Sequence, residues 1–107
     1  MKRKIALITG ATSGIGAGCA RRFAQGGYDV IVTARRNELL QALKTELEDA
    51  GVRVLTLCFD VRDREATRQA IETLPADWQA VDVLVNNAGL ARGLEPEYEG
   101  SFDDWDE

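Results

Sequence analysis

Three glycines near the amino terminus could form a phosphate-binding turn. Gly10, Gly14 and Gly16 lie in the segment TGATSGIG (residues 9–16), between an apolar run at 4–8 and a helical pattern over 17–24. A strand that turns through glycines directly into a helix leaves the first N–H groups of that helix unpaired. These donors, together with the positive end of the helix dipole, favour the binding of a phosphate.

Each glycine has a separate predicted role. Gly10 allows a tight turn, Gly14 lets a pyrophosphate approach the backbone, and Gly16 lets the helix lie close to the sheet. The spacing G-x-x-x-G-x-G differs from the commonest dinucleotide fingerprint, and no Gly-Lys-Ser/Thr follows as it does in a P-loop. Taken alone, the glycines are also compatible with an ordinary strand-to-helix turn that binds nothing.

The surrounding pattern predicts an α/β fold. Apolar, largely β-branched runs at 4–8, 30–34, 52–59 and 81–85 are typical of strands that are covered on both faces. Helical patterns separate these runs. We therefore expect a Rossmann-type, doubly wound parallel sheet in βαβαβαβ order, with only its first four strands present.

Three apolar stripes define the expected helices. The first comprises Ile15, Cys19, Ala20, Phe23 and Ala24 and ends at Gly26-Gly27. The second follows an N-cap at Asn37 and comprises Leu39, Leu40, Leu43, Leu47 and Ala50. The third is capped by Asp63, carries Ala66, Ala70, Ile71 and Leu74, and is stopped by Pro75.

Polar or small residues follow every predicted strand. Ligands of parallel α/β sheets bind beyond the carboxyl ends of the strands. The first strand delivers the glycines there, and the other three deliver Arg35-Arg36, Asp60-Val61 and Asn86-Asn87-Ala88-Gly89. We interpret this convergence as one nucleotide site.

The end of the second strand predicts NADP(H) rather than NAD(H). NAD-specific sites place an acidic residue there to hold the ribose hydroxyls. Ala34 occupies that position and does not repel a phosphate, and Arg35 and Arg36 follow it. Guanidinium groups suit a phosphate dianion. The alternative is a solvated arginine pair at the start of the next helix.

Composition limits the other function classes. The 107 residues carry a net charge of −5, which argues against a nucleic-acid partner. We expect a dinucleotide-binding half-domain over 1–91, with a net charge of +1, and an acidic loop with a truncated helix start over 92–107, with a net charge of −6.

Several kinds of site are excluded or disfavoured. The chain has no histidine, which removes a His-based triad and argues against a metal centre. Cys19 and Cys58 form no C-x-x-C motif, so we expect buried, reduced thiols. No run of 18 apolar residues is present, so we expect no membrane span and a cytoplasmic location.

The glycine motif, Asp60-Val61 and the Asn86-Asn87-Ala88-Gly89 run together resemble the short-chain dehydrogenase/reductase family. The resemblance extends from residue 4 to about residue 106. Within the family, the chain is similar to NADP-dependent 3-hydroxy acid dehydrogenases that act on L-allo-threonine or serine. That similarity rests on Arg35-Arg36, on LPADW at 74–78 and on NAGLA at 87–91 followed by GLEP at 93–96.

The resemblance implies roles for the candidate residues. The segment Gly10, Ala11, Thr12, Ser13, Gly14, Ile15 and Gly16 would wrap the cofactor diphosphate, with hydroxyl contacts from Thr12 and Ser13. Asp60 would accept a hydrogen bond from the adenine amino group, and Val61 would pack nearby. Asn87, Ala88 and Gly89 would let the nicotinamide ribose lie close to the fourth strand. Asn87 could equally tie neighbouring strands together.

The family's Tyr-x-x-x-Lys pair is absent. Tyr28 is followed four residues later by Val32, and Tyr98 by Phe102, so no catalytic residue can be assigned. We therefore expect the first half of a longer, homo-oligomeric (dimeric or tetrameric) oxidoreductase for a small hydroxy acid or carbonyl compound. A non-catalytic NADP(H)-binding module and a remnant without activity are the alternatives.

Overall fold

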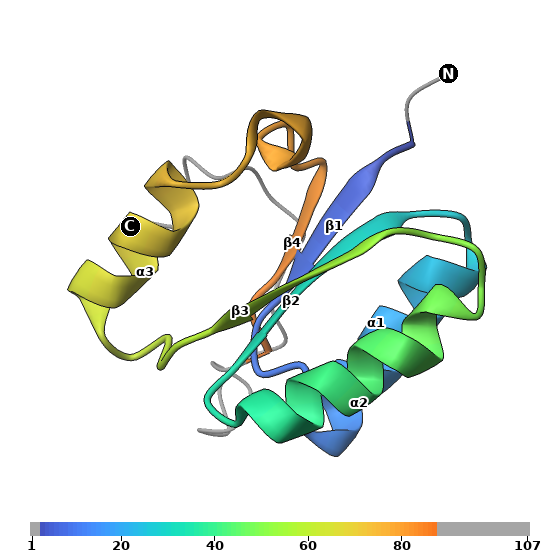
Figure 1. Ribbon diagram of the computed structural model, residues 1–107, viewed down its shortest axis with the longest axis horizontal. Coiled ribbons are helices and arrows are strands. Elements are labelled where there is room, and N and C mark those ends of the chain that lie inside the picture. The colour runs from blue at the N-terminus through green and yellow to red at the C-terminus, as the bar shows by residue number, and fades with distance from the viewer. Residues whose placement is uncertain (1–2, 88–107) are drawn as a thin grey trace.

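The computed structural model describes residues 3–87. Strands and helices alternate along the chain (Figure 1). The elements are β1 (Ile5–Ile8), α1 (Gly14–Gln25), β2 (Asp29–Ala34), α2 (Asn37–Glu48), β3 (Val54–Cys58), α3 (Arg64–Glu72), the 3₁₀ turn η1 (Ala76–Trp78) and β4 (Val83–Val85). The predicted order of four strands and three helices is confirmed. Residues 88–107, and with them the expected boundary after residue 91, lie outside the described part.

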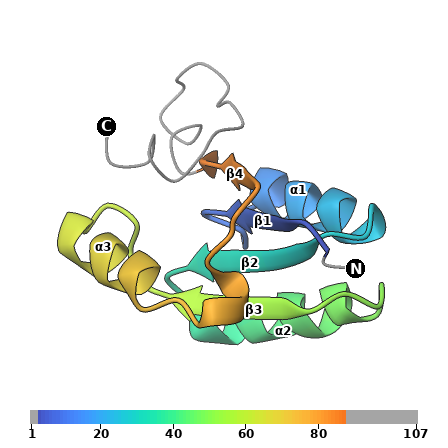
Figure 2. The ribbon, with the colours of Figure 1, turned by 90° about the horizontal axis from the view of Figure 1, so that it is seen from above.

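The strands form one parallel sheet in the order β3-β2-β1-β4. Helices α1 and α2 cover one face and α3 covers the other, so the sheet is doubly wound as predicted (Figures 1 and 2). Side chains that alternate along β1 and β2 enter two separate cores. Ile8 and Val32 face α1 and α2, whereas Leu7 and Ile31 face Leu74 and Trp78.

One predicted helix cap is confirmed and another is wrong. Asp63 caps α3, because its Oδ1 accepts the Ala66 N–H at 3.1 Å, as expected. The prediction that Asn37 caps α2 is wrong. Arg36 has the extended backbone of an N-cap and Asn37 is already helical. The Asn37 side chain instead accepts a bond from Gln41 one turn later, at 3.2 Å.

Four residues that were predicted to be buried are exposed. Helix α1 buries a stripe of small residues, Gly16, Ala17, Ala20 and Ala24, which leaves Ile15 62% exposed. Helix α2 buries Leu40, Leu43 and Leu47, and leaves Leu39 and Ala50 exposed. Cys58 is exposed because it ends β3, an edge strand of the described sheet, whereas Cys19 is half-buried.

Within residues 3–87, no helix has both the length and the apolar character that a membrane crossing requires.

Candidate functional site

The glycine turn has the geometry that its sequence predicts. Gly10 has a φ of 59°, which lies in the left-handed region that favours glycine. The Ser13 N–H donates to the Gly10 carbonyl at 3.2 Å and closes the turn. The Ala11 N–H donates to the Thr33 carbonyl at 2.9 Å, which fixes the turn to the end of β2.

Helix α1 begins with two unpaired donors. Ser13 is its N-cap: the hydroxyl oxygen accepts the Gly16 N–H at 3.2 Å and the carbonyl accepts the Ala17 N–H at 2.8 Å. Within the part of the chain that the structure describes, no acceptor engages the N–H groups of Gly14 and Ile15. These two donors lie at the positive end of the helix dipole, where an anion is stabilised.

Gly16 is required by the turn itself. A Cβ at this position would lie 2.2 Å from the Gly10 carbonyl oxygen and 2.9 Å from Asn87 Nδ2. We predicted that Gly16 lets the helix approach the sheet, but the close contacts are with the glycine turn and with the Asn87 side chain. A Cβ at Gly14 would meet nothing within 4 Å, so packing of the described residues does not demand a glycine there.

Asn87 ties the end of β4 to the turn. It is buried, and its Nδ2 donates to the Gly10 carbonyl at 3.0 Å and to Ser13 Oγ at 2.9 Å. Ser13 Oγ in turn donates to the Gly10 carbonyl at 3.0 Å. The Ser13 hydroxyl is therefore occupied by contacts within the turn and with Asn87.

A cavity of about 450 Å³ opens where the strands end. It brings together residues from all four strand ends, which the sequence predicted. The lining residues are Gly10, Thr12, Ser13, Thr33, Ala34, Arg35, Phe59, Asp60, Val61, Arg62 and Asn87. Of the predicted site residues, Gly14, Ile15, Gly16 and Arg36 lie outside this lining, and Ala88 and Gly89 lie outside the described residues.

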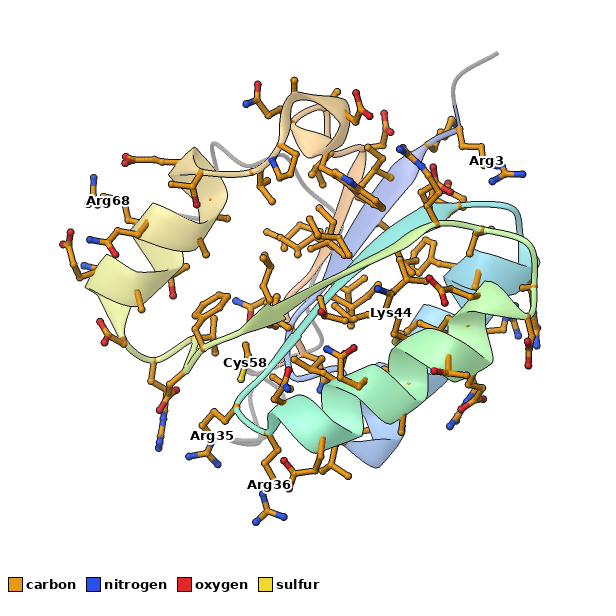
Figure 3. The ribbon with its side chains drawn as sticks, viewed as in Figure 1. Arg3, Arg35, Arg36, Lys44, Cys58 and Arg68 are labelled. Atoms are coloured by element: carbon orange, nitrogen blue, oxygen red, sulfur yellow. The ribbon has the colours of Figure 1, made fainter. Side chains whose placement is uncertain are left out.

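The two arginines after β2 are placed differently. Both leave the turn between β2 and α2 (Figure 3), and the Cys58 thiol donates to the Arg35 carbonyl at 3.4 Å. Arg35 lines the cavity and makes no salt bridge with residues 3–87. Arg36 is the N-cap residue of α2 and is not part of the lining. Arg35 is therefore the better placed of the two for an anion bound in the cavity.

Asp60 holds an arginine that the sequence reasoning missed. Its Oδ1 accepts the Arg62 N–H at 2.9 Å and Arg62 Nε at 3.2 Å, and its Oδ2 accepts Arg62 Nη2 at 3.0 Å. These bonds from Arg62, together with its charge and that of Arg35, lower the pKa of Asp60 to about 2. Asp60 is thus an ionised acceptor. The sequence did contain a sign of this pairing, because an aspartate side chain often accepts the backbone N–H two residues later.

One buried hydroxyl in the lining is unpaired. Thr33 is 2% exposed, and its Oγ1 finds no hydrogen-bond partner among residues 3–87. Nearly all buried polar groups of native proteins are paired, and exceptions concentrate at functional sites. The lining thus offers a cation at Arg35 and an acceptor-only carboxylate at Asp60, and the start of α1 next to it offers two N–H donors. This donor and acceptor set suits a ligand that carries phosphates and an amino group.

Comparison with known proteins identifies the family of this chain. The family model for short chain dehydrogenases matches residues 4–107. The NADP-dependent 3-hydroxy acid dehydrogenase YdfG of Salmonella typhi is 55% identical over 102 residues, which are 95% of this chain and 40% of that protein. The chain thus spans about two fifths of the length of that relative.

Solved structures agree with this assignment. The serine dehydrogenase of Escherichia coli is 49% identical with a TM-score of 0.73, and the match covers 95% of this chain and 46% of that one. A closed serine dehydrogenase complexed with NADP+ is 48% identical with a TM-score of 0.70, over 78% of this chain and 32% of that one. The chain therefore belongs to the short-chain dehydrogenase family.

Proposed function

We propose that this chain supplies the NADP(H)-binding part of an oxidoreductase that transfers hydride between the nicotinamide and a small hydroxy acid or its carbonyl counterpart. One observation carries the proposal. The free N–H donors of α1, the unpaired Arg35 and the ionised Asp60 surround the carboxyl edge of one parallel sheet.

The diphosphate would lie at the start of α1. The N–H groups of Gly14 and Ile15 supply donors, and the hydroxyl of Thr12 lines the adjoining cavity. Because a Cβ at Gly14 would project into open space, a side chain there would occupy the path of the phosphate rather than disturb the packing. This supports a ligand-facing role for Gly14.

The adenosine half would lie between β2 and the loop after β3. Arg35 would bind the 2′-phosphate, with Arg36 as a more distant second cation. Asp60 would accept a hydrogen bond from the adenine amino group, and Val61 would pack against the base. Asn87, Ala88 and Gly89 would border the nicotinamide ribose, as the family resemblance implies.

The bound cofactor would supply the hydride chemistry, and this chain would supply binding and orientation. The names of the relatives favour a 3-hydroxy acid such as serine as substrate. A non-catalytic NADP(H)-binding module is the second candidate. We expect a cytoplasmic homo-oligomer in either case.

A matched pair of substitutions tests the proposal by titration with NADPH, followed by nucleotide fluorescence. Gly14→Asp places a carboxylate beside the phosphate site, so we expect affinity to fall by about 100-fold, as befits a like charge in a site for charge-assisted bonds. Gly18→Asp makes the same change one turn later in α1, where a Cβ also meets nothing within 4 Å. We expect this control to bind NADPH as the native protein does.

Equal affinity of the native protein for NADPH and NADH would contradict the cofactor assignment. If the native protein binds neither nucleotide, the correct interpretation is a remnant without activity. If NADPH binds, turnover of serine or 3-hydroxypropionate by the full-length protein separates an enzyme from a binding module.

A further inference from the structure

Two arginines from the described residues line the cavity, Arg35 and Arg62, and Arg62 is paired with a neighbouring carboxylate. It gives Asp60 three bonds, one from the main chain and two from the guanidinium fork. The Arg62 side chain is 65% exposed and that of Asp60 is 36% exposed. Exposed ion pairs contribute little to folding stability, so stability is a weak reason for this arrangement.

The bonds from Arg62 leave one hydrogen-bond acceptor position of the Asp60 carboxylate unused. An ionised carboxylate has about four acceptor positions on its two oxygens. Oδ1 accepts two bonds from Arg62 and Oδ2 accepts one. Because the guanidinium fork fixes the plane of the carboxylate, the free position of Oδ2 also has a fixed direction.

Two charged side chains act on Asp60, and they come from different elements. Arg62 belongs to the same loop, whereas Arg35 comes from the turn between β2 and α2. The neighbouring Asp63 uses its own carboxylate to cap α3. Arg35 makes no salt bridge with residues 3–87 and is proposed to bind the 2′-phosphate, so Arg62 is the group that orients the Asp60 carboxylate.

We propose that Arg62 is a positioning residue that holds the Asp60 carboxylate as an acceptor for the 6-amino group of a purine. This inference rests on the proposed NADP(H) site. A 6-oxo purine presents a carbonyl oxygen at the same place, so two acceptors would face each other and no bond would form. Arg62 thereby sets the preference of the site for adenine over hypoxanthine without touching the base.

The experiment compares binding of NADP+ and of its hypoxanthine analogue to the full-length protein by calorimetry. We expect the native protein to prefer NADP+ by about tenfold or more, the value of one bond to a charged group. Arg62→Met should reduce this preference to about threefold or less through weaker binding of NADP+. Arg62→Lys, which keeps the charge but lacks the planar fork, should fall between them.

Arg68→Met is the matched control. Arg68 is an exposed arginine on the outer side of α3, away from Arg35 and Cys58 (Figure 3). We expect it to leave both affinities unchanged. In an Asp60→Ala background, Arg62→Met should have no further effect on the preference, because Arg62 acts only through that carboxylate.

Other outcomes overturn the inference. If Arg62→Met weakens both nucleotides equally, Arg62 supports the loop or contacts a group that the two share. If it still weakens NADP+ in the Asp60→Ala background, Arg62 touches the nucleotide directly. Either result leaves the proposed function standing. Failure of the native protein to bind NADP+ would instead remove the proposed function and this inference with it.

Discussion

Polar groups at the amino ends of the strands and those at the carboxyl ends are used in opposite ways. At the amino ends of the strands, Asp29 is 3% exposed and accepts three bonds. The donors are the Arg53 N–H at 2.9 Å, Arg53 Nε at 3.0 Å and Arg3 Nη1 at 3.4 Å. Asp82 accepts the Ile5 N–H at 2.9 Å in the same way before β4.

Arg53 links the hydrogen bonds at the amino ends of the strands to η1, through Trp78 and Asp77. Its guanidinium carbon lies 4.6 Å from the centroid of the Trp78 ring, and its Nη1 lies 3.6 Å from Asp77 Oδ2. At the carboxyl ends, by contrast, several groups lack hydrogen-bond partners among the described residues: the N–H groups of Gly14 and Ile15, the Thr33 hydroxyl and the Arg35 guanidinium. The buried pairing of Asp29 thus serves the fold, whereas the unpaired groups at the carboxyl ends are available to a ligand.

The largest expected effect is that of Gly16→Ala, which attacks the carboxyl edge through its packing. The new methyl would overlap the Gly10 carbonyl oxygen, so the turn or α1 must move. We expect a loss of about 3 kcal/mol of unfolding free energy, the upper range for overpacking, together with loss of NADPH binding. Gly18→Ala, with open space around it, should be neutral or raise stability by up to about 1 kcal/mol. Urea titration of both variants measures the difference.

Arg35→Ala should affect binding and leave folding unchanged. Loss of one or two charge-assisted bonds to a phosphate should lower NADPH affinity by about tenfold or more. NADH affinity and the melting temperature should change little. Arg36→Ala should cost less NADPH affinity than Arg35→Ala, because Arg36 is outside the cavity lining. A larger effect at Arg36 would reverse the assignment.

Asp29→Asn should do the reverse and destabilise the fold without changing NADPH affinity. We expect a cost of about 1–3 kcal/mol for weakening bonds to a buried charged acceptor. Burial raises the pKa of Asp29, but the bonds from Arg53 and Arg3 outweigh it and the net pKa is lowered. The unfolded chain therefore binds more protons, and stability falls as the pH drops below about 4 and through the lowered pKa. Asp29→Asn should flatten that acid limb in denaturation measured against pH.

The smallest expected effects have opposite signs at two buried threonines. Thr33→Val removes a hydroxyl without a partner and keeps its shape, so unfolding free energy should rise by up to about 1 kcal/mol. Thr9→Val removes a hydroxyl that donates to Asn86 Oδ1 at 3.1 Å, so stability should fall by about 1 kcal/mol. A destabilised Thr33→Val variant would show that the hydroxyl is paired in solution.

Local pattern predicted the fold and most of the lining of the site. Uninterrupted apolar runs identified the strands, and the rule for parallel sheets placed Gly10, Arg35, Asp60 and Asn87 together at the carboxyl ends of the strands. These inferences succeeded because each depends on the position of a residue relative to its own strand.

The missed features depend on contacts that a linear pattern does not contain. The pairing of Arg62 with Asp60 is set by the conformation of one loop, and the unpaired state of Thr33 depends on every group around it. The exposure of Ile15 follows from a helix that begins at Gly14 and buries small residues. An apolar stripe read with ideal periodicity cannot place such a start to within one residue.

The contact between Asn87 and Gly10 also orders the assembly of the molecule in time. Its two residues lie 77 positions apart, so the nucleotide turn is locked only after nearly all of the described chain exists. At ribosomal rates of about 5–20 residues per second, the turn waits roughly 4–15 s for its partner. Strands β1, β2 and β3 can pair with shorter loop closures in that interval. The side of the site that Asn87 forms is thus completed last, together with the pairing of β4.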